Sequence, residues 1–283
     1  MQRLLRRTIF SLLAVLPAVG LFIGAGVAAS ASVRPAATST SAEKATAAKA
    51  AAVAFVKSLK VGYHARNIPV KGLTQVESTN WSGYADTGSG FSSVSATWKE
   101  PTPSCSGRST ALAAFWVGID GYSSSSVEQD GTLIECYEGG TYQFSWWEIY
   151  PVNSVQVVGE SVAAGDSITA TVTRSGTSYK LSVTDSTHSA NSFTTTQTYA
   201  GAADSSAEWI AEAPSGSTGV EPLAKFSTWT DANSKATAGS VSGVISSFPD
   251  DEITMITSSG ATEAQPSALG SAGNSFTVTW ERS

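Results

Sequence analysis

The chain has 283 residues, of which 17 are basic and 23 acidic, so its formal charge is −6. This length allows one large or two small domains, and a hydrophobic fraction of 41% is ample for a packed core. The acidic balance excludes a basic nucleic-acid binder, because binding to phosphates needs a surplus of Lys and Arg. Two His and two Cys are too few for a multi-zinc protein, so we expect no metal and no cofactor.

Residues 1–31 have the pattern of a secretory signal peptide. Three arginines precede an apolar run over residues 8–29, and small residues follow at 28–31. A basic head, an apolar middle and a small-residue exit are typical of a cleaved export signal. A transmembrane anchor is the alternative, since the run is about long enough to span a bilayer. We therefore expect a secreted, extracellular protein with no membrane contact after removal of the signal.

Residues 32–77 are predicted to form a basic pro-segment. Residues 42–60 are rich in Ala and Lys and carry an apolar stripe that includes Val53, Val56 and Leu59, which favours a helix. Seven basic and two acidic residues lie between 34 and 77, whereas residues 78–283 hold seven basic and 21 acidic residues. Opposite charge predicts that this segment docks on the body and restrains it as an intramolecular inhibitor. A disordered linker is the alternative.

The body, residues 78–283, is predicted to be a single all-β domain. Polar and apolar residues alternate over residues 168–173, 177–185 and 275–281, and Gly-containing turn signals recur between such runs. Many short strands in a body of this size indicate one sandwich or barrel. Cys105 and Cys136 are expected to form one disulfide, as is usual in exported proteins.

Three predicted strands place aromatic rings and carboxylates together on one face. Because side chains alternate along a strand, residues two apart share a face. The three sets are Trp116, Gly118 and Asp120; Phe144, Trp146, Glu148 and Tyr150; and Glu208, Ile210 and Glu212. Such faces predict a binding groove, because large aromatic rings beside acids are costly on an unoccupied surface. Ordinary solvated faces with incidental Trp are the alternative.

The chemistry that the body offers is that of carboxylates and amides. His188 is its single His, and no Gly-x-Ser-x-Gly motif accompanies it, so a surface His is expected there rather than a catalytic one. What remains is a Glu or Asp as acid and base, with polar side chains that stabilise developing charge.

Five sequence blocks are spread over the body: NWSGY at residues 80–84, FWVGIDG at 115–121, QDG at 129–131, WEIYP at 147–151 and AEWIAE at 207–212. Their order and spacing resemble those of the glutamic peptidases, the eqolisins. The resemblance implies a concanavalin A-like sandwich of two antiparallel sheets, one of which curves into a substrate groove. It also implies a secreted acid endopeptidase that acts on proteins or peptides and is made with a removable pro-segment. A monomer is expected, as for most secreted hydrolases.

The resemblance further implies a catalytic pair and its supporting residues. The family's catalytic Gln falls on Gln129 and its catalytic Glu on Glu208, with Glu212 on the same strand face as the other candidate. Glu208 would activate a water, and Gln129 would stabilise the tetrahedral intermediate. The substrate-binding residues implied are Trp81, Gly83, Trp116, Asp120, Glu148 and Tyr150.

Two other functions remain open on the same sandwich. A glycoside hydrolase would use two carboxylates, such as Glu148 and Glu208, on either side of a sugar. A non-catalytic carbohydrate-binding module would use the Trp-lined groove alone. The predicted pro-segment favours a peptidase, since proteases need latency. A base with a reference pKa near 4.3 further predicts an acidic pH optimum.

Overall fold

The structure is a computed structural model that describes residues 40–62, 67–69, 75–107 and 109–283. The predicted signal peptide and the first part of the predicted pro-segment lie outside the described residues. Helix α1 (Ser41–Val56) belongs to the same compact unit, Thr40–Ser283, as all the strands. Among the described residues, no helix is long and apolar enough to cross a membrane.

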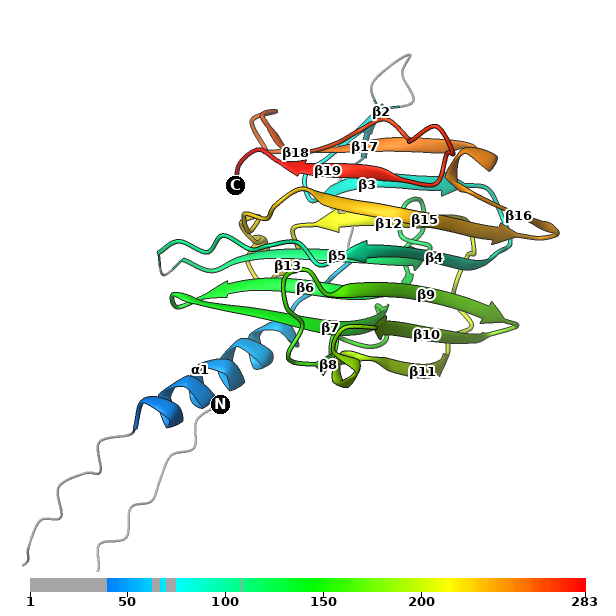
Figure 1. Ribbon diagram of the computed structural model, residues 1–283. Helices are drawn as coiled ribbons and strands as arrows, with labels where there is room; N and C mark the ends of the chain where they lie inside the picture. The colour runs from blue at the N-terminus through cyan, green and yellow to red at the C-terminus, as the bar shows by residue number, and fades with distance from the viewer. Residues whose placement is uncertain (1–39, 63–66, 70–74, 108) are drawn as a thin grey trace, which may run out of the picture. The chain divides into compact units, whose positions relative to one another are not determined.

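The strands form a sandwich of two sheets (Figure 1). We call the sheet on which α1 packs the front sheet and the other the back sheet, irrespective of the view in Figure 1. The front sheet runs in the order β8 (Gln156–Gly159), β7 (Gly140–Tyr150), β6 (Val127–Tyr137), β5 (Ala111–Ile119), β12 (Ser206–Glu212), β3 (Trp81–Thr87), β17 (Asp250–Ile256), β2 (Gln75–Ser78) and β1 (Asn67–Pro69). The back sheet runs in the order β11 (Phe193–Thr198), β10 (Ser178–Asp185), β9 (Ser167–Ser175), β4 (Phe91–Lys99), β15 (Trp229–Ala238) and β16 (Val241–Gly243). All these pairings are antiparallel except that of β17 with β2.

Smaller elements complete the sandwich. Strands β18 (Thr262–Pro266) and β19 (Phe276–Trp280) connect β17 to the start of β15 and so close one side. A short hairpin of β13 (Ser215–Gly216) and β14 (Gly219–Val220) follows β12, and two single turns, η1 (Ser189–Asn191) and η2 (Ile245–Ser247), lie in loops. The predicted all-β sandwich is confirmed.

The main core lies between the two sheets. Alternation along β5 and β12 sends Phe115, Val117 and Trp209 into this layer, where each is fully buried. The indole Nε1 of Trp209 donates to the carbonyl oxygen of Ser95 in the back sheet at 3.0 Å. The alternate residues of the same front strands point away from the back sheet and form a second face, which is separate from the main core.

Helix α1 packs on that other face. It begins at a capping box, in which the backbone N–H of Glu43 donates to the Thr40 hydroxyl and the Thr40 N–H donates to the Glu43 carboxylate. Ala52, Val56 and Leu59 are buried in a second apolar cluster with residues of the front sheet. The helix ends at Val56, four residues before the predicted end, because Lys57 and Ser58 form a turn.

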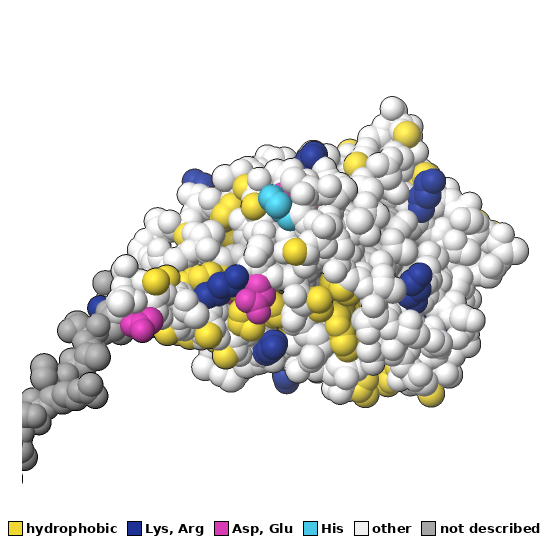
Figure 2. Space-filling model, turned by 60° about the horizontal axis from the view of Figure 1, so that its bottom comes forward, with side chains coloured by type: hydrophobic (Ala, Val, Ile, Leu, Met, Phe, Trp, Pro, Cys, Tyr) yellow, Lys and Arg dark blue, Asp and Glu magenta, His cyan; other side chains and the backbone are white. Residues whose placement is uncertain are grey.

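Contacts between α1 and the body are mainly apolar. Among the described residues, one ion pair joins them: Lys49 Nζ lies 3.5 Å from a Glu160 carboxylate oxygen, and both side chains are exposed. An exposed pair of this kind contributes little free energy. Figure 2 shows hydrophobic side chains around the helix where it meets the body, with one basic and one acidic side chain next to each other among them, on a face that is otherwise largely uncharged. Apolar burial therefore holds the helix more than charge does.

The predicted disulfide is confirmed. Cys105 and Cys136 are bonded, with 5.4 Å between their Cα atoms, and the bond ties the loop after β4 to the end of β6.

Candidate active site

A row of directly paired residues crosses the helix-facing side of the front sheet. From β17 to β7 the row consists of Asp251, Ala85, Glu208, Gly118, Gln129 and Glu148. Directly paired residues point to the same side of a sheet, so their side chains share one surface. The small residues Ala85 and Gly118 separate the polar ones, and the side chains of Trp116 and Val127 fill the space that a side chain at Gly118 would occupy. This row forms the floor of the expected groove.

The chain that follows α1 occupies this groove. Lys60 pairs with Ser215 through two backbone hydrogen bonds, since each N–H donates to the other residue's carbonyl oxygen, at 2.9 and 3.0 Å. Val61 and Gly62 come next, and both are buried. The segment thus adds a very short antiparallel strand to the edge of the site, as an extended peptide does when it binds a sheet.

Gln129 and Glu212 hold the two ends of one peptide bond. The Gln129 side-chain amide donates from Nε2 to the Val61 carbonyl oxygen at 2.7 Å. The Gly62 N–H donates to both carboxylate oxygens of Glu212, at 3.1 and 2.8 Å. Glu148 accepts the Val61 N–H at 3.2 Å and also lies 3.3 Å from Gln129 Nε2. A side-chain amide and one carboxyl group therefore hold the Val61–Gly62 peptide bond, and a second carboxyl group holds the N–H of the preceding bond.

The two carboxyl groups influence each other's protonation. Burial raises the pKa of Glu212, and the donors that surround it, which include Gly62 N–H and Trp116 Nε1, act in the opposite direction. Burial also raises the pKa of Glu148, and the charge of Glu212 raises it further. Both carboxyl groups accept hydrogen bonds, but two adjacent buried acids do not both ionise readily, so the pair favours holding one proton between them. An acid and a base are thus available at the same bond.

Glu208 lies on the same face but in different surroundings. Burial raises its pKa, the hydroxyl of Ser206 and the backbone N–H of Tyr122 lower it, and the charge of Asp120 raises it. Within the described residues, no hydrogen bond joins Glu208 to Val61 or Gly62. Of the two candidate glutamates on β12, Glu212 is the one that accepts the N–H of Gly62, and Gly62 follows the Val61 whose carbonyl oxygen accepts from Gln129.

The expected substrate-binding residues separate into two groups. Trp81, Trp116, Glu148 and Tyr150 lie on the groove side, where the rings of Trp81 and Trp116 meet edge to face at 5.0 Å and Trp116 Nε1 donates to Glu212 at 2.9 Å. Gly83 also lies there, but a Cβ at this position would stand 2.1 Å from the Trp209 carbonyl oxygen. The close approach of β3 to β12 is enough to explain this glycine.

Asp120 has a different environment from the one expected. Asp120 directly follows β5, and its φ is positive, at 70°. The chain turns at this residue, so the side chain does not take the direction that alternation along β5 predicts. Its carboxylate accepts the backbone N–H groups of Ala203, Asp204 and Ser205 at 2.7 to 2.9 Å, and the Ser205 hydroxyl at 2.8 Å. Asp120 therefore anchors the loop that leads into β12.

Four residues that contribute to the site were not among the predicted site residues. Asn80 Nδ2 lies 3.4 Å from Glu212, and it directly precedes the Trp81 that the sequence did single out. Ser215 contributes only main-chain groups, which carry no sequence signal. Val61 and Gly62 lie far from Gln129 along the chain, and the single hint was a glycine just after the predicted helix.

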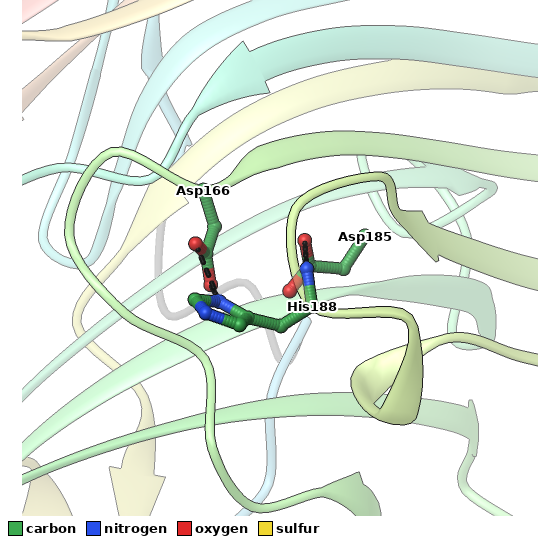
Figure 3. A group of neighbouring side chains, drawn as sticks. All are labelled: Asp166, Asp185 and His188. Carbon is green, nitrogen blue, oxygen red and sulfur yellow. Dashed lines mark hydrogen bonds and ion pairs between the residues drawn. The ribbon is translucent and has the colours of Figure 1, made fainter.

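A second polar cluster, Asp166, Asp185 and His188, joins two loops (Figure 3). Its ligand atoms lie close enough together to hold a metal ion. However, Asp185 Oδ1 already accepts the N–H groups of Thr187 and His188, and Asp166 Oδ2 accepts that of Ala163. The Asp166 carboxylate bonds His188 Nδ1 at 2.8 Å and raises the pKa of the half-exposed imidazole. The cluster closes turns, and His188 is a surface residue, as predicted.

Comparison with known proteins identifies the family of this chain. A family model described as the peptidase A4 family matches residues 79–280. The chain belongs to the peptidase A4 family. The resemblance to the glutamic peptidases is thereby confirmed.

Individual relatives agree with this assignment. Scytalidopepsin B of Scytalidium lignicola is 42% identical over 109 residues, which are 38% of this chain and 39% of that protein, so this match spans less than half of either. Aspergillopepsin-2 of Aspergillus niger is 26% identical over 197 residues, covering 61% of this chain and 69% of that protein.

Solved structures agree as well. A scytalido-glutamic peptidase bound to a transition state analog inhibitor aligns with a TM-score of 0.62 and 25% identity, over 72% of this chain and 98% of that one. The aspergilloglutamic peptidase of Aspergillus niger aligns with a TM-score of 0.53 and 29% identity, over 60% and 99%.

Proposed function

We propose that this protein is a secreted acid endopeptidase in which Gln129 and Glu212 act together on the bound peptide bond. The observation that carries the proposal is the seating of Val61–Gly62, whose atoms stand in for those of a substrate. Family membership favours peptide hydrolysis over the sugar-cleaving and sugar-binding alternatives. The proposal that the protein is exported rests on the signal-like residues 1–31. The proposal that it is made in a latent form rests on the segment that fills the groove.

The proposed reaction uses the two contacts at opposite ends of the bond. With the segment gone, water enters beside Glu212, whose carboxylate takes a proton as the water oxygen attacks the substrate carbonyl carbon. The carbonyl oxygen gains negative charge where the Val61 oxygen now lies, 2.7 Å from the Gln129 amide. Glu212 then gives the proton to the departing nitrogen, which occupies the position of the Gly62 nitrogen. Glu148 orients the substrate residue that supplies the carbonyl group, because its carboxylate accepts the backbone N–H of the residue at the position of Val61.

The choice of Glu212 differs from the sequence-based prediction of Glu208. Both residues face the groove side of β12, four positions apart, so alternation alone does not separate them. Contact with the amide nitrogen of the seated bond supports Glu212. Glu208 lies in the same cross-strand row as Gln129, with only Gly118 between them, and is the alternative candidate for the general base.

Hydrolysis of a denatured protein at about pH 3.5 tests this proposal. The full chain is compared with the variants Glu212→Gln, Gln129→Ala and Glu208→Gln, and the matched Gln substitutions at 208 and 212 change charge equally. We expect a loss of roughly 100-fold or more in kcat for the Glu212 and Gln129 variants, the order found when a charge-stabilising donor is removed. The Glu208 variant should keep most of its kcat. Loss in Glu208→Gln with activity retained in Glu212→Gln would restore the first assignment, and sugar release without proteolysis would reject the peptidase.

A further inference from the structure

We propose that the outer face of the back sheet, which points away from the front sheet, is a docking surface for an acidic polysaccharide. Such a polymer consists of sugars that carry hydroxyl and carboxylate groups. The groove and α1 lie on the opposite side of the sandwich, so the inference goes beyond the proposed function and does not depend on it. It rests on the charges, the hydroxyl groups and a hollow on this face.

The outer face is positively charged, although the body as a whole is strongly acidic. Residues 78–283 hold seven basic and 21 acidic residues. Three of the seven basic residues are exposed on strands of the back sheet: Lys99 of β4, Lys180 of β10 and Lys235 of β15. The six strands contain two acidic residues, Asp185 and Asp231, and both are buried. The face therefore presents ammonium groups without competing carboxylates, which attracts a polyanion.

Hydroxyl groups cover most of the rest of the face. Directly paired residues share one side of a sheet, and one row across the five strands consists of Lys235, Ser95, Thr171, Ser182 and Thr194. The next row consists of Thr237, Ser93, Thr173, Lys180 and Thr196. The alternate residues Val94, Val172 and Leu181 are buried in the main core, so both rows point outward. Each hydroxyl can donate and accept a hydrogen bond, as the hydroxyls of a sugar do.

A hollow on the same face offers a seat for a sugar. Its volume is about 410 Å³, which is within the range of small-molecule sites. Strand β15 has a bulge after Ala232, which lines the hollow, and Asn233 in this bulge has a φ of +57°. The side-chain amide of Asn233 donates to the Thr97 hydroxyl at 2.9 Å. The other groups that line the hollow include the side chains of Lys99, Thr169 and Thr230.

The spacing of the lysines suits a polymer more than a single small anion. Lys180 and Lys235 lie on strands that are three strand spacings apart, and Lys99 lies on the strand next to Lys235 but four positions beyond its partner Ser95. At ~4.8 Å between strands and ~3.4 Å per residue, these Cα separations are about 14–16 Å. One chain of sugars could reach all three charges, and several weak contacts along one chain add up.

An apolar partner would gain little on this face. Among the described residues, four large hydrophobic side chains are exposed, and one of them, Val241, lies on a strand of the back sheet, at its edge. A membrane or an apolar protein surface would therefore bury little hydrophobic area there. Ammonium groups, hydroxyls and a sugar-sized hollow together match an acidic polysaccharide.

Binding of the full chain to polygalacturonate at pH 5 and low salt tests the inference. Two triple variants with the same net charge are compared. The first changes Lys99, Lys180 and Lys235 to Gln, and the second changes Lys44, Lys57 and Lys225, which are exposed outside the back sheet, to Gln. We expect the first variant to bind about tenfold more weakly than the parent chain, as follows from the loss of three exposed ion pairs. The second variant should bind within about twofold of the parent chain. Equal weakening in both would show that only net charge matters and would overturn the inference.

Two further arms test the chemistry of the partner. Neutral dextran should not be bound, and binding of dextran as tight as that of polygalacturonate would refute the role of the carboxylates. Thr169→Val and Thr230→Val together keep the shape of the hollow but remove two hydroxyls from it, so polygalacturonate should bind about threefold more weakly while the melting temperature stays the same. Unchanged binding in this double variant would reject the hollow as a sugar seat.

Binding and hydrolysis fail independently in these experiments. The first triple variant should hydrolyse soluble denatured protein at the parental rate, because its lysines lie away from the groove. Gln129→Ala should bind polygalacturonate as the parent chain does, whatever its rate of hydrolysis. A parent chain that hydrolyses protein but does not bind polygalacturonate would overturn the docking surface and leave the proposed function standing.

Discussion

Replacing the buried Asp86 with Asn should remove part of the pH dependence of folding. Asp86 lies on β3 between Ala207 of β12 and Asp250 of β17, and its side chain is fully buried. Burial raises its pKa to about 9, and the charge of Asp250 adds to the effect. Because an Asp in an unfolded chain titrates near 3.9, the folded protein holds a proton that the unfolded chain has lost over the range between these values.

The size of the effect follows from that difference. The stability linked to Asp86 is fully present below about pH 4 and falls as the pH rises toward 9. At pH 7 the unfolded chain lies about three units above its pKa, and at 1.36 kcal/mol per unit this amounts to about 4 kcal/mol relative to pH 3.5. This is a large share of the roughly 5–15 kcal/mol that stabilises a typical domain. Asn cannot ionise, so Asp86→Asn should reduce the loss between pH 3.5 and 7 by up to about that amount.

Urea unfolding at pH 3.5 and at pH 7, followed by Trp fluorescence, measures the effect. The Glu212→Gln background prevents self-digestion during the measurement. Glu281→Gln, at an exposed position near the end of the chain, is the control and should leave the pH dependence unchanged. If Asp86→Asn changes the free energy of unfolding equally at the two pH values, the argument from burial is refuted.

Three further changes probe the fold and the groove. Replacing Cys105 and Cys136 with Ser should lower the free energy of unfolding by about 3 kcal/mol, measured by urea unfolding, because the bond closes a loop with a sequence separation of 31. Gly83→Ala should reduce the melting temperature markedly, since its Cβ would meet backbone 2.1 Å away; a shift below 2 °C would contradict the close approach. Val56→Lys places a charge in the apolar cluster under α1, so the full chain should hydrolyse an added substrate without a lag after acidification. A lag as long as that of the parent chain would show that the helix does not control access.

Acid stability is expected of the whole molecule and not of Asp86 alone. Burial also raises the pKa of Glu128 to about 9, of Glu135 to about 8 and of Glu100 to about 7. Each of these groups takes up a proton on folding at neutral pH, so their contributions change in the same direction. The free energy of unfolding should therefore be largest in acid, where the proposed endopeptidase would act.

Local patterns in the sequence were sufficient to predict much of the fold. Alternation identified the strands, and the Ala- and Lys-rich stretch identified the helix, because both depend on neighbouring residues. The groove face was predictable in part, since Trp116 and Glu148 each lie on the face of their own strand that carries aromatic rings and carboxylates. Gln129 was placed only by the resemblance to the glutamic peptidases. Cys105 and Cys136 had no other partner available in the chain.

The details that the sequence left open depend on how distant strands are staggered. Glu208 and Glu212 have the same parity, so only the tertiary structure determines which of them meets the residues bound to Gln129. Asp120 left its expected face because its positive φ turns the chain at the end of β5. Val61 bonds to Gln129, 68 positions away, and Gly62 bonds to Glu212, 150 positions away. Contacts over such separations cannot be predicted from local sequence patterns.

The pairing of Lys60 with Ser215 uses only atoms that every amino acid possesses. A partner held in this way must offer an extended stretch whose own N–H and C=O groups are not already paired. A strand inside a folded sheet has those groups paired, whereas an unfolded stretch leaves them accessible. The main-chain groups of Ser215 therefore favour an unpaired, extended stretch of polypeptide at this edge of the front sheet.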